Sequence, residues 1–369
     1  MIYLFRLLFL FFILVHGGVS AFGQNDPVDK KATRKTKALY ANLKGISGRG
    51  VVFGHQDDLA YGIGWKAEKG KSDVKDVCGS YPGLYGWDVS KLGQAFNIDT
   101  VNFENMKIWI KEAYKRGGIN TISWHMDNPV TGGSSWDNTP AVSAILPGGE
   151  KHEFYNLRLD LFADFLKDLK VGLGTKIPII FRPFHEHTGN WFWWGKGNCT
   201  KEEYISLWRY TVKYLRDDKR IHHLLYVYST DQFDSREQYL EFYPGDDYVD
   251  ILAFDDYHSI KSVEDRNKLV FRLKSVVEIA ESKYKIAAFS ETGFETIPDM
   301  HWFTNVLLDG ITSDETGMRI SYVMLWRNAW PHHHYAPYPG HPSAPDFVKF
   351  REDPFILFED DLPNMHKKP

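Results

Sequence analysis

Cysteine is scarce in this sequence: Cys78 and Cys199 are the only two among 369 residues. Two cysteines cannot form a disulfide framework, so a hydrophobic core must stabilise the fold, and a 43% hydrophobic composition is ample for one. Whether the two cysteines pair with each other stays open, because a sequence does not give the distance between them.

Neither sign of charge predominates. There are 44 Lys and Arg residues against 48 Asp and Glu, which leaves a net charge of -4. Such a balance gives no reason to expect nucleic acid or an anionic membrane as a partner. The chain also has no internal repeat and no linker rich in Pro, Gly or Ser after its N-terminal segment.

Long hydrophobic runs are limited to the N-terminus. Residues 1–23 place Arg6 before the run LLFLFFILV, and Val19-Ser20-Ala21 fits the small residues of a cleavage site. The pattern is typical of a secretory signal peptide cleaved after Ala21 or Gly23. The run is short for a membrane span of about 20 residues, so a retained anchor is the weaker alternative. We expect an exported protein, periplasmic or secreted, with no stable membrane insertion after cleavage.

Strand-like and helix-like segments alternate along the rest of the chain. The predicted strands are Val51–His55, Leu84–Asp88, Asn120–His125, Ile177–Phe184, His223–Ser229, Asp250–Tyr257, Lys285–Glu291 and Ser321–Asn328. The predicted helices are Thr33–Leu43, Phe103–Arg116, Tyr155–Leu169, Glu202–Leu215 and Val263–Ala280. In the third of these helices, Leu157, Leu161, Phe165 and Leu169 form the apolar stripe.

This alternation predicts an α/β fold with parallel strands and helical crossovers. Eight such units favour a single (β/α)8 TIM barrel over residues 24–369, with enlarged loops at the carboxyl ends of its strands. The alternative is a doubly wound open sheet, which would normally carry a glycine-rich phosphate turn after an early strand. Only the weak GISGRG at Gly45–Gly50 is present, and it precedes the first strand.

Polar side chains cluster where the predicted strands end, which is where a barrel carries its active site. The fourth strand ends in FRPFHEHTGNWFWWG and the seventh in FSETG. Each places a glutamate, Glu186 or Glu291, directly after an apolar run. The third, sixth and eighth strands add His125, Asp255, Tyr257, Trp326 and Arg327. The pattern predicts a cleft that carries carboxylates and is walled by indoles.

A pair of carboxylates across such a cleft suits hydrolysis of a glycosidic bond. One carboxylic acid protonates the leaving oxygen, and the second carboxylate attacks the anomeric carbon or activates water. Indole faces pack against the apolar face of a sugar ring. Either glutamate alone could be a structural residue, but both together among these aromatics favour catalysis. No cofactor is required.

Two other classes of protein remain as alternatives. The spacing His185-x-His187 suggests a metal-dependent hydrolase of the amidohydrolase type, but Arg327 follows the eighth strand where that class needs a carboxylate. A non-catalytic carbohydrate-binding module would explain the aromatics but not the glutamate pair. The run His332–His334 is interpreted as a solvated loop, and one indole of the Trp193–Trp194 pair is expected to pack into the protein.

The motifs resemble glycoside hydrolase family 26, the β-mannanases of clan A. RPFHEHTGNWFWWG at 182–195 is similar to its acid/base segment, and SETG at 290–293 to its nucleophile segment. VVFGHQDD at 51–58, SWHMDNP at 123–129, DDYH at 255–258 and LWRN at 325–328 follow in the family's order. The resemblance extends over about residues 35–350.

The resemblance implies a retaining enzyme that cleaves β-1,4-mannosidic bonds in mannan, galactomannan or glucomannan. It implies Glu186 as general acid/base and Glu291 as nucleophile, with carboxyls about 5–5.5 Å apart. Among the substrate-binding residues, His185 would bind the substrate and orient the site, and Trp191 would form an aromatic wall on the leaving-group side. Tyr257 would hydrogen-bond the nucleophile, and Asp255 would support the site. His125, Trp326 and Arg327 would line the glycone subsites.

The resemblance leaves several properties open. Mixed-linkage β-glucan and β-1,3-xylan are alternative substrates within the family. The choice between endo attack and release from a chain end depends on loop lengths, and the long loop at 130–153 is a candidate for blocking the cleft. A monomer is expected.

Overall fold

The computed structural model describes residues 26–369, so the predicted signal peptide lies outside the described residues. Eight parallel strands form the sheet at its centre: β1 (Val51–Gln56), β4 (Leu84–Asp88), β5 (Ile119–Ser123), β8 (Ile179–Arg182), β9 (Leu224–Thr230), β10 (Ile251–Asp256), β11 (Ile286–Thr292) and β12 (Tyr322–Leu325). They are hydrogen-bonded in chain order, and β12 pairs with β1 from Val52↔Tyr322 to His55↔Leu325. The pairing closes the sheet into the predicted barrel, and all eight predicted strands are confirmed.

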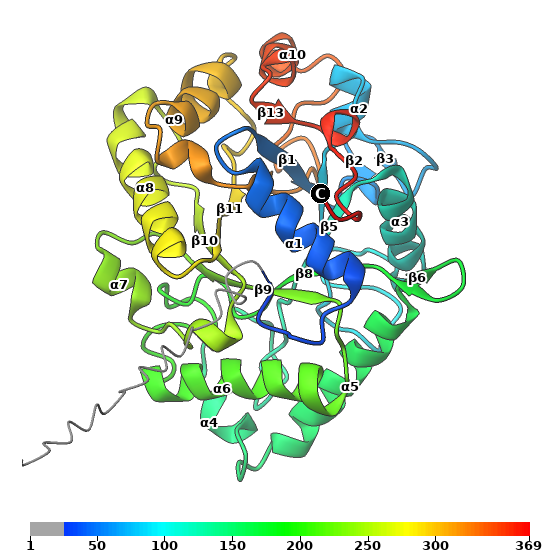
Figure 1. Cartoon of the computed structure of the whole chain (residues 1–369), viewed down its shortest axis with the longest axis vertical. Helices are drawn as coiled ribbons and strands as arrows, with labels where there is room; N and C mark the ends of the chain where they lie inside the picture. Colours follow the sequence, from blue (N-terminus) through cyan, green and yellow to red (C-terminus); the bar gives the residue numbers. More distant parts are fainter. Residues whose placement is uncertain (1–25) are drawn as a thin grey trace, which may run out of the picture.

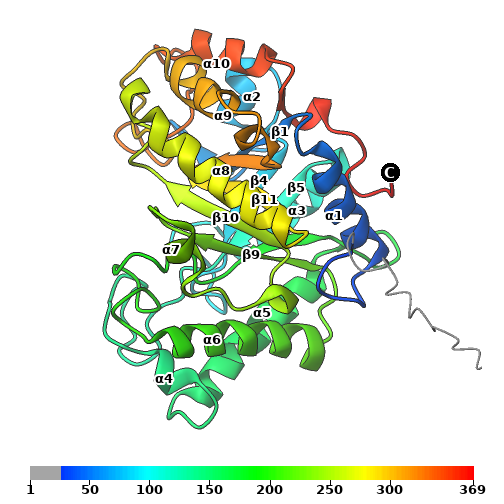
Figure 2. The same ribbon diagram turned by 60° about the vertical axis from the view of Figure 1, so that its left-hand side comes forward.

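Helices surround the barrel (Figure 1). They are α2 (Asp73–Cys78), α3 (Phe103–Arg116), α4 (Val142–Ile145), α5 (His152–Asp168), α6 (Lys201–Lys213), α7 (Arg236–Leu240), α8 (Arg266–Ser282), α9 (Asp309–Thr312) and α10 (Ala344–Glu352). The π-helix η1 (Tyr214–Asp218) continues directly from the end of α6, and the π-helix η4 (Phe303–Leu308) leads directly into α9. Figure 2 shows α5 and α6 side by side outside the strands, and the Tyr155 and Thr211 hydroxyls join them at 2.6 Å.

Local sequence accounts for several helix ends. Thr200 and Glu203 form a capping box at the start of α6, in which each side chain bonds the other residue's backbone N–H. The Asn102 side chain accepts from Glu104 N and Asn105 N at the start of α3. That helix ends at Gly117, whose φ of 111° suits glycine because it has no Cβ.

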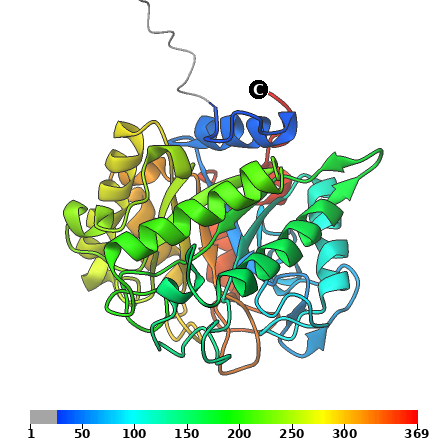
Figure 3. The ribbon, with the colours of Figure 1, turned by 90° about the horizontal axis from the view of Figure 1, so that it is seen from below.

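The inside of the barrel is filled by aliphatic side chains such as Val52, Ile180, Leu225 and Ala288. Leu39, Tyr40 and other apolar residues of α1 (Arg34–Ile46) belong to the same core cluster. Helix α1 therefore closes the N-terminal end of the barrel, and Figures 1 and 3 show it lying across that end. The opposite end, where the strands finish, carries the polar residues.

The predicted apolar stripe of the third helix is only half right, because Phe165 and Leu169 are buried but the other two residues are not. Leu157 and Leu161 on α5 are 62% and 38% exposed. The buried residues of α5 are Tyr155, Leu159, Phe162, Ala163, Phe165 and Leu166. Packing of α5 against both α6 and the barrel rotates its buried face away from the stripe that four-residue spacing alone suggested.

Short elements in the loops were not predicted. The hairpin β2 (Tyr61–Gly62) and β3 (Trp65–Lys66) follows β1, and the hairpin β6 (Lys170–Val171) and β7 (Thr175–Lys176) precedes β8. Strand β13 (Ile356–Leu357) pairs with the start of β1. The 3-10 turns are η2 (Asp246–Tyr248), η3 (Val263–Asp265), η5 (Gly317–Arg319) and η6 (Glu359–Asp361). Such short pieces follow tertiary contacts more than periodicity.

The cysteines and the histidine run also have defined places. Cys78 ends α2 and Cys199 lies just before α6, and both are free thiols, so the open question of a disulfide is answered against it. His332 is exposed, but His334 is buried with its Nε2 3.2 Å from His341 Nε2. The prediction of a solvated loop therefore holds only for the first histidine of the run.

Among residues 26–369, no helix has the length and hydropathy needed to cross a membrane.

Candidate active site

The backbone turns sharply where β8 ends. Phe184 and Glu186 have φ values of 47° and 55°, in the left-handed region that residues with a Cβ rarely adopt. The amide of Glu186 donates to Ser229 O at the end of β9, at 3.0 Å, which fixes the turn. Strained backbone of this kind is characteristic of functional sites, where the surrounding structure holds it in place.

This turn directs the Glu186 side chain into a cavity of about 430 Å³ at the carboxyl end of the barrel. The Trp191 indole donates to Glu186 Oε2 at 2.8 Å. Burial raises the pKa of Glu186 well above its usual value, and the nearby Glu291 and Asp255 raise it further. The carboxyl therefore stays protonated at a pH where an exposed glutamate would be ionised.

Glu291 lies on the other side of this cavity, near the end of β11. The pairing of β10 with β11 shifts register between Phe254↔Phe289 and Asp255↔Glu291, leaving Ser290 as the extra residue of a bulge. A bulge re-aims the side chains around it, and here it places Glu291 opposite Asp255. Alternation along an unbroken strand would not predict this direction.

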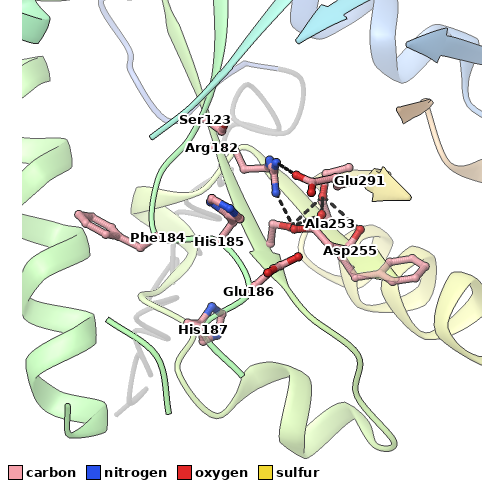
Figure 4. A network of polar contacts seen from close by, with 12 residues as sticks. Ser123, Arg182, Phe184, His185, Glu186, His187, Ala253, Asp255 and Glu291 are labelled. Carbon is pink, nitrogen blue, oxygen red and sulfur yellow. Dashed lines mark hydrogen bonds and ion pairs between the residues drawn. The ribbon is translucent and has the colours of Figure 1, made fainter. Parts of the chain in front are cut away.

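Arg182, at the end of β8, connects the carboxylates of two other strands, as Figure 4 shows. Its Nη1 donates to Asp255 Oδ2 at 2.5 Å, and its Nη2 forms an ion pair with Glu291 Oε2. The Tyr257 hydroxyl donates to Glu291 Oε1 at 2.7 Å. An ion pair and a hydroxyl donor both favour the ionised form of a carboxylate. Glu291 therefore has a cation on one oxygen and a hydroxyl donor on the other, whereas burial favours the protonated form of Glu186.

Asp255 lies beneath this pair and is completely buried. Ser229 Oγ and Ser290 Oγ donate to its Oδ1 at 3.0 and 2.7 Å. Burial raises the pKa of Asp255 to about 7, and Arg182 opposes that rise. Asp255 thus binds Arg182 and does not line the cavity, so the structure places it behind the substrate-binding residues among which it was predicted.

Five predicted residues line the 430 Å³ cavity together: Glu186, Glu291, His125, Tyr257 and Trp326. His185 lies behind His125, with the two Nε2 atoms 3.1 Å apart, and is only 1% exposed. It therefore contacts the site through His125. Arg327 instead lines a neighbouring cavity of about 580 Å³ together with Tyr61 and Trp330, where it pairs with Asp99 Oδ1 at 3.0 Å.

Trp136 is a residue of the site that motif reasoning missed. It lies in the loop after β5, is 51% exposed, and lines the cavity of the two glutamates. Its ring stacks on His125 at 5.3 Å with an interplanar angle of 14°. A lone tryptophan in a long loop carries no periodic signal, although the indole-rich character of the predicted cleft could have included it.

Several predicted aromatics and histidines have structural roles. Trp193 and Trp194 are both fully buried, so the expectation that one of them packs inside understated their burial. His187 bonds the Tyr204 and Tyr228 hydroxyls at 3.0 Å each, away from His185. No group of three or more His, Cys, Asp or Glu side chains among residues 26–369 is arranged to hold a metal ion. The His185-x-His187 pair thus does not form the metal site of the amidohydrolase alternative.

A (β/α)8 barrel in which two glutamates face one aromatic cavity from the ends of the fourth and seventh strands defines a barrel-type glycoside hydrolase. The family model described as "Glycosyl hydrolase family 26" matches residues 28–305. The chain belongs to glycosyl hydrolase family 26, as its motifs indicated.

Relatives support this placement. A mannan endo-1,4-β-mannosidase of Bifidobacterium adolescentis is 40% identical over 280 residues, 72% of this chain and 27% of the relative. One of Caldalkalibacillus mannanilyticus, "Mannan endo-1,4-beta-mannosidase A and B", is 27% identical over 84% of this chain and 59% of its own length. This chain thus spans about a quarter of the length of the first relative and about three-fifths of the length of the second. The structure of a GH26 β-mannanase from Bacteroides ovatus superposes with a TM-score of 0.87 and 45% identity, over 91% of this chain and 98% of that one.

Proposed function

We propose that this protein is a retaining endo-type β-1,4-mannanase, with Glu186 as its general acid/base and Glu291 as its nucleophile. One observation carries the proposal: two glutamates face the same cavity, Glu186 bonded by the Trp191 indole and Glu291 paired with Arg182. A retaining glycosidase needs such a pair, because one carboxyl must give a proton while the other attacks.

The steps follow from the contacts of each carboxyl. Glu186 donates its proton to the leaving oxygen as Glu291 attacks the anomeric carbon, and a glycosyl-enzyme forms. Glu186, now ionised, takes a proton from water, and that water releases the sugar with the original configuration. Arg182 and Tyr257 hold Glu291 in one orientation between these steps, because together they bind both of its oxygens.

The substrate class follows from the walls of the cavity and from the relatives. Trp136, Phe192 and Trp326 are aromatic residues of the cavity, and such rings pack against the apolar faces of sugars. The relatives compared above are named for cleavage of mannan, which makes mannan, galactomannan or glucomannan the proposed substrate. Mixed-linkage glucan and β-1,3-xylan are the alternatives to exclude.

The test is a time course of products on galactomannan, glucomannan, mixed-linkage glucan and xylan. We expect cleavage of the first two, with a ladder of oligosaccharides at early times. One dominant disaccharide from the start would argue for release from a chain end, and cleavage of glucan without mannan would overturn the substrate. Proton NMR of the first product should show the β-anomer, since an initial α-anomer would contradict retention.

We further propose export to the periplasm or the medium. The arginine, apolar run and small residues at 1–23 support this proposal, and a polymeric substrate outside the cell requires it. N-terminal sequencing of the protein from its native cells tests it, with a start at Phe22 or Gln24 expected. A start at Met1 would contradict cleavage.

A further inference from the structure

A chain of three polar residues, Asp88, His125 and His185, lies behind one wall of the cavity. Asp88 ends β4, His125 follows β5 and His185 follows β8, so neighbouring strands bring the three together. Asp88 Oδ2 is 2.8 Å from His125 Nδ1, and His125 Nε2 is 3.1 Å from His185 Nε2. The predicted glycosidase roles do not use Asp88.

Asp88 is held firmly in this position. It is fully buried, and its Oδ2 also accepts from Ser123 Oγ at 3.0 Å and from His125 N at 3.1 Å. Its Oδ1 accepts from Ser90 N at 2.8 Å. A carboxylate with this many donors stays ionised and orients the imidazole that it binds.

The contact between the two imidazoles holds one proton. If His125 Nε2 carries it, His125 is an imidazolium and His185 is neutral with its proton on Nδ1. If His185 Nε2 carries it, His125 is neutral and bonds Asp88 through Nδ1 alone. Both rings cannot carry a proton at the contact, so the charge of His125 decides the tautomer of His185.

The surroundings favour the charged form of His125. Burial opposes it, but Asp88, Glu291 and Asp99 all raise the pKa of His125, and the result is a pKa above the usual value. The Trp136 ring stacked on the imidazole adds a cation–π contribution. Burial, Arg182 and His125 itself lower the pKa of His185 well below its usual value. The other groups near these three residues that can carry a charge include Glu186, His258, Lys261 and Glu295, which line the cavity of His125, and Arg327, which is paired with Asp99.

We propose that Asp88 is a positioning residue that holds His125 as an imidazolium and His185 as its neutral acceptor, so that the cleft carries a fixed positive charge beside Glu291. The inference rests on the proposed glycosidase function for its effect on rate. Because His125 lines the same cavity as Glu291, its charge stabilises the ionised nucleophile. The charge is present below the pKa of His125 and is lost as pH rises through it.

The test uses an activated aryl β-mannobioside, whose good leaving group needs no acid in the first step. The rate of that step on this substrate therefore does not depend on the proton of Glu186. On that substrate, the decrease of kcat/KM at alkaline pH (the alkaline limb) then reports the loss of the His125 proton. We expect Asp88→Asn to move this limb to lower pH by about one to two units, as loss of a paired carboxylate does, and Asp88→Glu to restore part of the shift. Ser123→Ala is the matched control, because it removes one neutral donor to Asp88 Oδ2 and leaves the carboxylate in place. We expect a much smaller shift of the limb in this variant.

Long-range ¹H–¹⁵N NMR of the wild-type imidazoles tests the charge without reference to activity. We expect an imidazolium at His125 and a neutral ring at His185 near pH 7, and a lower titration midpoint for His125 in Asp88→Asn. A neutral His125 at that pH, or an aryl-substrate limb unmoved in a folded Asp88→Asn, would overturn the inference. Failure of the wild type to cleave any mannoside would instead overturn the proposed function, and the NMR titration would still decide the charge.

Discussion

Arg182 and Glu291 form an ion pair across the mouth of the barrel, from the end of the fourth strand to the seventh. The other arm of the guanidinium binds Asp255 at 2.5 Å, and all three side chains are nearly inaccessible to solvent. The orientation of the proposed nucleophile therefore depends on a planar, two-armed cation that can bind two carboxylates at once.

Arg182→Lys should abolish most activity although it keeps the charge. An ammonium is a point charge without the fork, so it cannot hold Asp255 and Glu291 together in this geometry. We expect kcat to fall by roughly a hundred-fold or more, because one charge-assisted contact in a buried site contributes about 1.5–3 kcal/mol and two are disturbed. Arg116→Lys, at the Glu359 pair outside the site, is the control, and equal losses in both variants would contradict the role.

Glu291→Ala and Glu186→Ala should differ on substrates with different leaving groups. Loss of Glu291 should stop turnover of every substrate, because no glycosyl-enzyme can form. Loss of Glu186 should spare the first step on activated aryl mannosides while blocking polysaccharide cleavage. Stopped-flow release of the aryl group measures that step, and an equal loss on both substrates would exclude Glu186 as the acid.

Tyr257→Phe should reduce kcat/KM by roughly ten- to a hundred-fold. The change removes one hydrogen bond to a charged carboxylate, and such bonds contribute about 1.5–3 kcal/mol. Tyr335→Phe is a matched control, because this ring lines the same cavity and the Tyr257 hydroxyl, not that of Tyr335, bonds Glu291. If both variants kept steady-state rates within a factor of two of the wild type, a catalytic role for the contact between Tyr257 and Glu291 would be excluded.

Trp136→Ala should weaken substrate binding more than chemistry. The indole is half exposed on the wall of the cavity and touches neither glutamate through a hydrogen bond among the described residues. We expect KM for mannan oligosaccharides to rise roughly ten-fold, as for loss of one aromatic packing surface, with a smaller change in kcat. Trp136→Phe should recover most of the affinity. A fall in kcat with KM unchanged would disprove the binding role.

His187→Gln should make folding stability less sensitive to acid. Burial lowers the pKa of His187 to about 3, whereas an unfolded histidine titrates near 6.5. As pH falls from about 6.5 toward 3, the unfolded wild type therefore gains a proton that the folded protein does not, and stability decreases. The difference in unfolding free energy between wild type and variant should shift by about 1.4 kcal/mol per pH unit below pH 6. Urea titrations at pH 7, 5.5 and 4.5 measure it, and parallel trends would contradict the linkage.

Local patterns were sufficient for the framework of this fold. Eight strands lie within a few residues of their predicted places, because apolar runs followed by polar residues mark strands that end at a functional rim. Glu186, Glu291, His125, Tyr257 and Trp326 share one cavity because the carboxyl ends of parallel strands meet at one end of a barrel. The buried face of α5 was only half predicted: Phe165 and Leu169 are buried, but Leu157 and Leu161 are exposed, because the helix packs against both α6 and the barrel.

The sequence alone determined the barrel, the family and the two glutamates, since these follow from periodicity and from short motifs at strand ends. The tertiary structure decided what surrounds them. The bulge at Ser290, the two arms of Arg182, the stack of Trp136 on His125 and the link from Asp88 to His185 all join residues far apart in the chain. Protonation states depend on burial and on charges a few ångströms away, and only the closed barrel brings those charges together.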